Sequence, residues 1–427
     1  MREMKDSGIE WIKQIPIEWK IMPNKYLMTK IKEINPVFNG EDILSLTMNG
    51  VIVRDLYAGG KMPTSFDGYQ RVHKGNLLMC LFDIDVTPRC VGLIKNEGIT
   101  SPAYSQFKCS DLADARYYNY YYMMLDNDKT LLHLSKNIRH SLTEDLLGMV
   151  PTVVPHLREQ VYIADFLDEK CDEIDSLIND IQKQINIIEV YKKTVITEVM
   201  TKGLKKNVEM KDSGVEWIGK IPKVWKLTKL KYELKYPMKY GASESGVDFR
   251  EELPRYIRIT DITSDNKLKK DGKLSLTEEQ AKGYVLNEDA ILFARSGGTV
   301  GKSFLYKKEY GRAAFAGYLI SAIPDNDKMI IEWLYYYTLS SVYWEWVNRI
   351  FTQATIQNIG ADKFGNMPIV IPDIETQKKI IDIIEKKCTQ MDDLLNSYKS
   401  QIYLLEQYKK SILYEYVTGK KEVGHNV

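Results

Sequence analysis

Residues 4–20 read MKDSGIEWIKQIPIEWK, and residues 210–226 read MKDSGVEWIGKIPKVWK. Twelve of the seventeen aligned positions are identical, and they include the proline and both tryptophans of each stretch. Low-complexity coincidence does not explain the match, because these rare residue types stay aligned without a gap. The chain is therefore predicted to contain an internal duplication, and this duplication decides the fold.

A second match links residues 151–201 to residues 368–418 at a constant offset of 217 positions. It has 19 identities in 51 positions and needs no gap. The segments between the two matches, 21–150 and 227–367, resemble each other only faintly. A period of this length is too long for a solenoid, so we expect a two-domain tandem with a pseudo-twofold relation.

The second match carries a long predicted helix in each copy. No Pro or Gly occurs from His156 to Lys202, and apolar residues recur in steps of four and three, the period of a coiled-coil seam. The seam positions are Leu167, Cys171, Ile174, Ile178, Ile181, Ile185, Ile188, Val195 and Val199, and 217 positions later Ile384, Cys388, Met391, Leu395, Tyr398, Ile402, Leu405, Ile412 and Tyr416. We expect the two helices to pack antiparallel, each roughly 65 Å long. The alternative is two ordinary core helices, each buried in its own domain.

One seam position is a lysine in both copies, Lys192 and Lys409. A lysine at this position marks either the end of the helix or a polar position that fixes the register of the pair. The sequence alone does not decide between these interpretations.

The two divergent segments are each predicted to be an α+β domain. Short β-type runs separated by turns come first, such as NLLMCLFDIDV at 76–86 and AILFARSGG at 290–298. An aromatic segment with a helical pattern follows, at 115–125 in the first copy and 331–347 in the second. The predicted fold class is thus α+β, with two tandem α+β domains separated and followed by long antiparallel coiled-coil helices.

The composition excludes several classes of protein. Of the 427 residues 44% are hydrophobic, and the net charge is +1, which argues against a wholly basic nucleic-acid coat. The five cysteines form no CxxC pair and the five histidines show no metal-binding spacing, so neither a disulfide framework nor a metal site is predicted. Because no apolar leader or membrane-spanning run is found, we expect a soluble cytoplasmic protein.

Lysines and tyrosines alternate at the start of the second domain. Seven lysines lie between Lys220 and Lys239, interrupted by one acidic residue, Glu233, and three tyrosines stand from Tyr232 to Tyr240. Contact with DNA phosphates requires this kind of surface. An ordinary solvated face is the alternative interpretation.

Two motifs resemble catalytic signatures without completing them. SGGTVGKS at 296–303 comes close to the phosphate-binding loop GxxxxGK(S/T), but Ser296 replaces the first glycine and a strand is predicted to follow. NPVF at 35–38 resembles the NPPF tetrad of amino-methylating enzymes, but Val37 replaces the second proline. No catalytic residue is therefore predicted in this chain.

Taken in order, these features resemble one family along essentially the whole chain: the specificity (S) subunit of type I restriction–modification systems. The boxes at 4–20 and 210–226 look like the domain starts of that family. VPTVVPHLREQ at 150–160 and MPIVIPDIETQ at 367–377 look like its junctions between domain and helix. YIRITDI and ATIQNI in the second domain also look typical.

The resemblance implies target recognition domains and spacer helices at defined places. We expect the domains at residues 1–155 and 207–372, the helices at 156–206 and 373–420, and a tail at 421–427. Each domain would read one half of a split site in double-stranded DNA, and the helices would set the gap between the halves. The chain itself would be non-catalytic and hold no cofactor.

The resemblance also implies partner subunits. Two modification subunits would dock on the helices and boxes and supply S-adenosylmethionine for adenine-N6 methylation. Two restriction subunits would add ATP- and Mg²⁺-dependent translocation and DNA cleavage. The alternative from another class of protein is a non-catalytic coiled-coil scaffold that binds proteins through its two domains.

The candidate DNA-binding residues of the second domain lie in glycine-rich and polar turns. Such turns let the backbone approach the duplex while side chains reach base edges. The predicted residues are Arg295, Ser296, Gly297, Gly298, Thr299 and Lys302, with Tyr240 and Gly241, and before the long helix Thr355, Gln357 and Asn358. The last three match the family's polar signature, and Gln and Asn suit adenine edges.

The first domain departs from that signature. At an offset of 217, Gln357 and Asn358 correspond to His140 and Ser141, which follow Asn137 and Arg139. Instead of a Gly-Gly turn the first domain has Asp83, Asp85 and Arg89, and carboxylates there suit the N4 amine of cytosine. For every residue of both sets, an ordinary surface turn is the alternative interpretation.

Overall fold

The computed structural model describes residues 2–57, 63–134, 141–205, 207–263, 266–352 and 358–424. The chain divides into two compact units, Met1–Ile181 with Lys399–Val427 and Gln182–Tyr398. Each unit contains a β-rich domain with short helices and a part of both long helices, so the predicted α+β class is confirmed.

The first unit is built around a four-stranded antiparallel sheet in the order β4-β11-β8-β9. Four two-stranded pairs surround it: β1-β2, β3-β12, β5-β6 and β7-β10. The strands are β1 (Met4–Asp6), β2 (Gln14–Pro16), β3 (Lys20–Pro23), β4 (Met28–Ile31), β5 (Leu44–Thr47), β6 (Gly50–Val53), β7 (Gln70–Val72), β8 (Leu77–Met79), β9 (Val91–Leu93), β10 (Gly98–Thr100), β11 (Ser105–Cys109) and β12 (Pro151–Val154).

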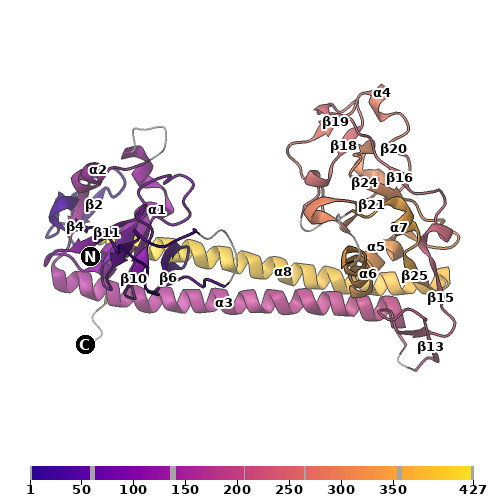
Figure 1. Ribbon diagram of the computed structural model, residues 1–427, viewed down its shortest axis with the longest axis horizontal. Coiled ribbons are helices and arrows are strands. Elements are labelled where there is room, and N and C mark those ends of the chain that lie inside the picture. The colour runs from indigo at the N-terminus through magenta and orange to yellow at the C-terminus, as the bar shows by residue number, and fades with distance from the viewer. Residues whose placement is uncertain are drawn as a thin grey trace. The chain divides into compact units, whose positions relative to one another are not determined.

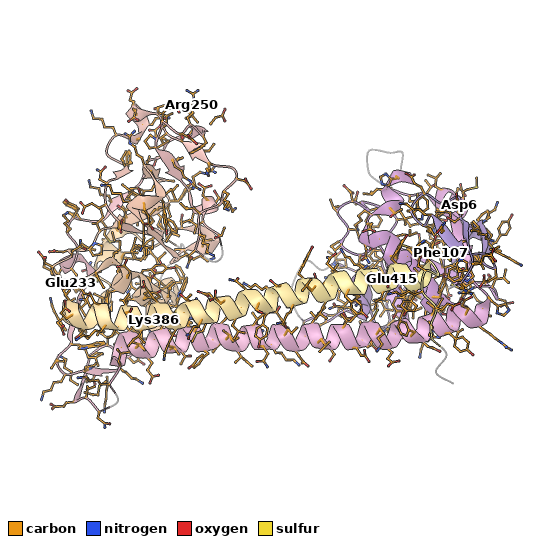
Figure 2. The ribbon with its side chains drawn as sticks, turned by 180° about the vertical axis from the view of Figure 1, so that it is seen from behind. Asp6, Phe107, Glu233, Arg250, Lys386 and Glu415 are labelled. Atoms are coloured by element: carbon orange, nitrogen blue, oxygen red, sulfur yellow. The ribbon has the colours of Figure 1, made fainter. Side chains whose placement is uncertain are left out.

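Helix α1 (Ala115–Asn127) confirms the helix predicted from the first aromatic segment. It begins at Asp114, whose side chain accepts hydrogen bonds from the backbone of Arg116 and Tyr117, an ordinary N-cap. All five of its tyrosines are buried in the core of the unit, to which Phe107 of β11 also belongs (Figure 2). A second short helix, α2 (Glu144–Met149), precedes β12.

The second unit has a four-stranded sheet in the order β16-β24-β21-β22 and a five-stranded sheet in the order β17-β19-β18-β23-β20. The pairs β13-β14 and β15-β25 complete it. The strands are β13 (Met210–Asp212), β14 (Lys220–Pro222), β15 (Lys226–Lys229), β16 (Lys239–Tyr240), β17 (Val247–Asp248), β18 (Arg255–Ile257), β19 (Leu274–Ser275), β20 (Val285–Leu286), β21 (Ala290–Ala294), β22 (Ser303–Tyr306), β23 (Ala313–Phe315), β24 (Leu319–Ala322) and β25 (Pro368–Ile371).

The duplication predicted from the sequence is visible in the pairing of these strands. Each entry box forms the same hairpin, which pairs Met4 with Pro16 in β1-β2 and Met210 with Pro222 in β13-β14. The five-stranded sheet has no such counterpart in the described part of the first unit. Figure 2 shows Arg250, which lies beside this sheet, at the end of the second unit away from Lys386 on the long helix.

The second aromatic segment differs from its prediction as one helix. It forms α5 (Ile331–Leu339) and α6 (Ser341–Thr352), which are separated at Ser340 by an extended backbone conformation with ψ of 158°. The Ser340 hydroxyl donates to the carbonyl of Tyr337 over 2.6 Å, and this local bond ends the first helix. Two further short helices are α4 (Glu278–Ala281) and α7 (Ala361–Gly365).

The two long helices are α3 (Leu157–Lys202) and α8 (Ile374–Val417), which lie side by side (Figure 1). The start of α3 packs on the end of α8 in the first unit, and the end of α3 packs on the start of α8 in the second. The predicted antiparallel pairing is therefore confirmed. The alternative of two ordinary core helices, each buried in its own domain, is wrong, because α3 and α8 pack on each other in both units and every predicted seam residue is buried or half-buried.

The two seam lysines are polar register positions, because both helices continue beyond them. Lys409 pairs with Asp175 over 2.6 Å in the first unit, and Lys192 pairs with Asp392 over 2.5 Å in the second. The two pairs are related by the repeat, with the roles of the helices exchanged. In the part of the chain that the structure describes, no helix is both long and apolar enough to cross a membrane.

Candidate nucleic-acid interface

The main candidate loop of the second unit joins β21 to β22. All five residues of β21 are buried, and the strand lies between two others in its sheet. The amide of Ala294 donates to the carbonyl of Lys302 over 2.8 Å, and the amide of Gly301 donates to the carbonyl of Ala294 over 2.9 Å. The loop is therefore closed at its base and anchored on a rigid strand.

The same loop contains the sequence that comes close to a phosphate-binding motif. A single 3-10 turn at Gly297–Thr299 is followed by β22, as predicted, and not by a helix. A phosphate-binding loop of that class needs the amide groups of a helix N-terminus. Its backbone therefore lacks the geometry for binding a nucleotide phosphate in that manner.

Arg295 gathers predicted residues from three separate segments. Its Nε donates to Oδ1 of Asn358 over 3.3 Å, and its guanidinium carbon lies 4.7 Å from the ring centre of Tyr240. Ser296 and Asn358 form an isolated antiparallel bridge, and the amide of Ile359 donates to the carbonyl of Arg295 over 2.9 Å. The structure thus brings Tyr240, Arg295, Ser296 and Asn358 into one cluster, which we call the Arg295 cluster.

The glycines of the prediction serve two different purposes. A Cβ at Gly241 would lie 2.3 Å from the carbonyl oxygen of Phe315, so the close packing of strands requires glycine there. A Cβ at Gly297 or Gly298 would meet nothing within 4 Å, and Gly297 has φ of +76°. The turn at 297–298 is therefore open to solvent, with Thr299 half-buried and Lys302 exposed beside it.

Five predicted residues lie outside the described residues: Asn137, Arg139, His140, Thr355 and Gln357. Ser141 is described, and the amide of the next residue, Leu142, donates to the carbonyl of Leu81 over 2.8 Å. Leu142 and Ile359 are related by the offset of 217, and each donates its amide to a carbonyl in the loop that follows β8 or β21, so the two bonds are equivalent. Ser141 therefore lies next to the loop after β8, as Asn358 lies next to the loop after β21.

That loop of the first unit joins β8 to β9 and contains Asp83, Asp85 and Arg89. Asp83 and Asp85 are exposed, and Asp83 has a positive φ of 47°. Arg89 differs from them, because its side chain is only 13% exposed and lies 3.6 Å from a carboxylate oxygen of Asp126. Arg89 thus lies beneath the loop, where it holds the loop to α1.

The network under this loop was not predicted from the sequence. The Asp126 carboxylate accepts a hydrogen bond from the amide of Cys90 over 2.9 Å and another from Nζ of Lys129 over 2.8 Å. Lys129 also donates to the carbonyl of Thr87 over 2.6 Å. A buried carboxylate thereby ties the base of the loop to the end of α1.

The second unit anchors its loop from a helix as well, but with other chemistry. The residue 217 positions after Asp126 is Tyr343 on α6, and its hydroxyl donates to the carbonyl of Gly301 over 2.5 Å. Ser303 and Thr338 share a further buried hydrogen bond of 2.6 Å. The repeat offset was the one sequence signal that could have found these anchors.

The lysine- and tyrosine-rich run is less cationic than its sequence indicates. Lys223, Lys226 and Lys235 form ion pairs with Glu209, Glu233 and Glu288 over 2.6 Å, 2.8 Å and 2.7 Å. The hydrogen bond that Lys235 donates to Glu288 raises the pKa of Lys235. Lys239 is exposed next to Tyr240 in the chain, so not every lysine of the run is neutralised by an ion pair.

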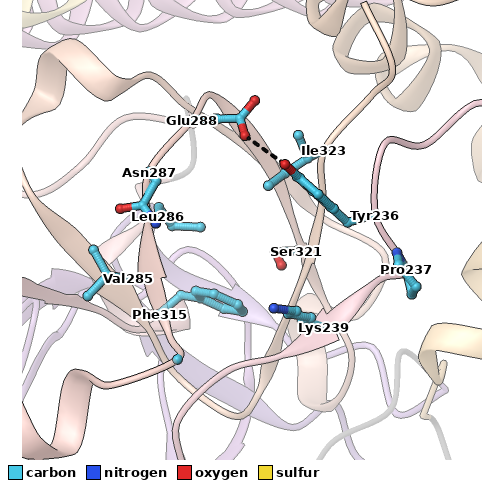
Figure 3. A pocket seen from close by; sticks show the side chains of 11 residues that line it. Tyr236, Pro237, Lys239, Val285, Leu286, Asn287, Glu288, Phe315, Ser321 and Ile323 are labelled. Atoms are coloured by element: carbon cyan, nitrogen blue, oxygen red, sulfur yellow. Dashed lines mark hydrogen bonds between the residues drawn. The ribbon is translucent and has the colours of Figure 1, made fainter.

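A pocket of about 220 Å³ lies beside β16. It is lined by Tyr236, Pro237, Lys239, Gly283, Val285, Leu286, Asn287, Glu288, Phe315, Ser321 and Ile323. The Tyr236 hydroxyl donates to Glu288 over 3.4 Å at its margin (Figure 3). Successive residues of a strand point to opposite faces, so Lys239 faces this pocket while Tyr240 faces the Arg295 cluster.

The buried thiols beside the first loop are core groups. Burial raises the pKa of Cys90 to about 12 and also raises the pKa of Cys80, so both thiols are neutral near pH 7. Among the residues that the structure describes, no group of three His, Cys, Asp or Glu side chains could hold a metal ion.

Residues 243–403 match the family model described as "Type I restriction modification DNA specificity domain". Two proteins of Methanocaldococcus jannaschii are each 24% identical to this chain, over 291 and 278 residues. The match over 291 residues is to the MjaX specificity subunit, and the match over 278 residues is to the "Type I restriction enzyme MjaVIII specificity subunit". The matches cover 66% and 63% of this chain but only 62% of each relative, less than two thirds of their length.

A solved structure is similar over nearly all of the chain. It is described as "Structural basis underlying complex assembly and conformational transition of the type I R-M system" and matches with a TM-score of 0.69. The match covers 95% of this chain and 99% of that chain at 14% sequence identity. At this identity the similarity establishes a shared fold.

Proposed function

We propose that this chain is a specificity subunit of a type I restriction–modification system, that it reads a bipartite site in double-stranded DNA, and that it catalyses no reaction itself. The β-rich domain of each unit would read one half of the site. One observation carries the proposal: each unit presents a hairpin loop on the same framework, but with different side chains.

The framework is repeated in detail. The backbone bond from Leu142 to Leu81 in the first unit has its counterpart in the bond from Ile359 to Arg295 in the second. The charged groups on the two loops nevertheless differ, with exposed carboxylates at Asp83 and Asp85 and a half-buried guanidinium at Arg295. Different half-sites require different groups at base edges, while the frame that positions them can stay the same.

The helices supply a spacer in this proposal. Their seam and the reciprocal pairs Lys409–Asp175 and Lys192–Asp392 allow one register of the antiparallel pair. A pair with one register has one length. We propose that this length sets the non-specific gap between the half-sites.

The helices also present candidate docking surfaces for modification subunits. Large apolar side chains are exposed at repeat-related positions: Leu177 and Leu394, Ile187 and Leu404, Tyr191 and Tyr408. Leu177, Leu404 and Tyr408 belong to the first unit, and Leu394, Ile187 and Tyr191 belong to the second. Two equivalent apolar patches suit two copies of one partner. We propose that each patch binds one modification subunit.

The cofactors of the reaction belong to the partners in this proposal. The modification subunits would carry S-adenosylmethionine for adenine-N6 methylation, and two restriction subunits would use ATP and Mg²⁺. The net charge of this chain is only +1, so the partners would supply much of the phosphate contact. Such a complex acts on cellular DNA, and we place it in the cytoplasm.

Co-expression of the chain with its modification subunit, followed by mapping of N6-methyladenine across the host genome, tests the proposal. A bipartite motif with a fixed gap is the expected result. Deletion of the modification subunit is the control and should abolish the new methylation. A stable complex that neither methylates nor binds DNA in a sequence-dependent way would overturn the proposal in favour of a protein-interaction scaffold.

A further inference from the structure

The Arg295 guanidinium is held on one face and one edge. The ring of Tyr240 lies 4.7 Å from its carbon, and Nε donates to Oδ1 of Asn358 over 3.3 Å. Among the described residues, no acidic group pairs with Arg295, and no partner is found for its two terminal nitrogens. The end of the guanidinium, which carries these two nitrogens, is therefore available to a ligand.

The backbone of Arg295 is fixed as well. Its amide donates to the carbonyl of Tyr318 over 3.0 Å, and its carbonyl accepts from the amide of Ile359 over 2.9 Å. The residue directly follows the buried strand β21. Tyr240 is itself anchored, because its hydroxyl accepts from the amide of Ala361 over 2.9 Å. Much of the entropy that a free arginine loses on binding is thus lost already on folding.

A guanidinium with a fixed plane and a free end suits one base in particular. In the major groove of DNA, O6 and N7 of guanine accept two parallel hydrogen bonds from arginine. A phosphate contact needs positive charge but no fixed plane, and the exposed Lys302 provides charge in the same loop. The nearby turn at Gly297 and Gly298 is exposed, and a Cβ at either glycine would meet no atom within 4 Å, so the protein itself does not cover this side of the loop.

We infer that Arg295 reads a guanine in the half-site of the second unit, with Tyr240 and Asn358 as positioning residues. The inference rests on the proposed function and adds the identity of one base to it. The nitrogens of the guanidinium end donate to O6 and N7, while the ring of Tyr240 and the amide of Asn358 hold the plane of the fork.

The first test uses the co-expressed complex with Arg295→Lys and Arg295→Ala. Lysine retains the charge but has no planar fork, so both variants should lose discrimination at one guanine of one half-site, by about ten- to a hundredfold. The other half-site should stay unchanged. Arg312→Ala is the matched control, because Arg312 is an exposed arginine of the same unit that pairs with Glu278 away from the loop.

The second test uses synthetic duplexes and the same complexes in a binding assay. Replacing the assigned guanine with 7-deazaguanine removes the N7 acceptor and should weaken binding of the unsubstituted complex by about tenfold. Inosine keeps O6 and N7 and should be tolerated. The Arg295→Ala complex should not distinguish the three duplexes.

The positioning roles have their own readout. Tyr240→Ala removes the platform and should lower discrimination at the guanine, while Tyr240→Phe keeps the ring and should retain most of it. If no guanine position depends on Arg295 although a bipartite motif is read, this inference is wrong and the proposed function stands. If the unsubstituted complex reads no bipartite motif, the proposed function itself fails.

Discussion

At the residue scale, each unit anchors its candidate reading loop to a nearby helix, and the two units do so by different means. Asp126 holds the first loop through the amide of Cys90 and through Lys129, and Tyr343 holds the second through the carbonyl of Gly301. Neither residue faces DNA in our proposal. Each controls the position of residues that do.

Substitution of these anchors is expected to affect one half-site each. Asp126→Ala leaves the buried amide of Cys90 without its acceptor and removes the ion pair with Lys129, and it should lower the free energy of unfolding by roughly 2 kcal/mol. It should also relax the half-site of the first unit only. Tyr343→Phe removes a single hydrogen bond, should cost about 1 kcal/mol, and should relax only the other half-site. Urea unfolding and methylation mapping measure the two effects, and equal loss at both half-sites would contradict the assignment.

The sequence predicted the loops but not their anchors. Gly297 and Gly298 come just after a strand pattern, and glycines there are a local signal of a turn. The loop after β21 could therefore be located from the sequence alone. The grouping of Tyr240, Arg295 and Asn358 depends on strand order, which periodicity does not contain. Asp126 and Tyr343 were missed because an aspartate and a tyrosine share no chemical pattern.

At the element scale, the long helices were the most predictable part of the fold. Their seam has a regular period over its whole length, and each seam position repeats after 217 residues. The break at Ser340 could not be predicted in this way, because residues 331–347 contain no Pro or Gly that would mark the end of a helix. The break at Ser340 is stabilised in part by α3, because the hydroxyl of Thr197 accepts a hydrogen bond from the amide of Ser341 over 2.7 Å.

The reciprocal lysine–aspartate pairs are expected to contribute to the register of the helices. Lys409→Asp replaces an ion pair with a repulsion toward Asp175 and should lower the free energy of unfolding by about 1 kcal/mol. Adding Asp175→Lys exchanges the two charges and should restore most of the lost free energy of unfolding. A double-mutant cycle in urea measures the coupling, and its absence in the exchanged variant would refute a role in register.

A matched control is available on the same helix. Lys386 pairs with Asp382 over 2.8 Å within α8, and both side chains are largely exposed. Lys386→Asp should change stability by less than about 0.5 kcal/mol, because a pair within one helix does not depend on the partner helix. High salt should weaken both effects.

At the scale of the whole molecule, the antiparallel pairing determines how a spacer can be lengthened. In an antiparallel pair of helices, the numbers of any two facing residues have a constant sum. The pairs Lys409–Asp175 and Lys192–Asp392 give the same sum, so the peptide bond after Ile181 faces the peptide bond after Ile402. One heptad inserted at both points keeps the seam and adds about 10 Å. The gap between the half-sites should grow by at most about three base pairs, with both half-sites unchanged. Methylation mapping measures this, and an unchanged gap in an intact complex would exclude the spacer role.

The two apolar patches make a prediction about stoichiometry. Leu404→Glu with Tyr408→Lys places charge on the patch of the first unit, and desolvation of these charges should prevent docking there. Native mass spectrometry should then find one modification subunit per chain where the unsubstituted complex holds two. The equivalent change in the second unit, Ile187→Glu with Tyr191→Lys, should also leave one, and the four changes together should leave none.

Lys410→Glu, an exposed change on α8 outside the patch, is the control and should retain two modification subunits. If both patch variants kept two subunits, docking would have to involve other surfaces, and the repeat of apolar positions would then need another explanation.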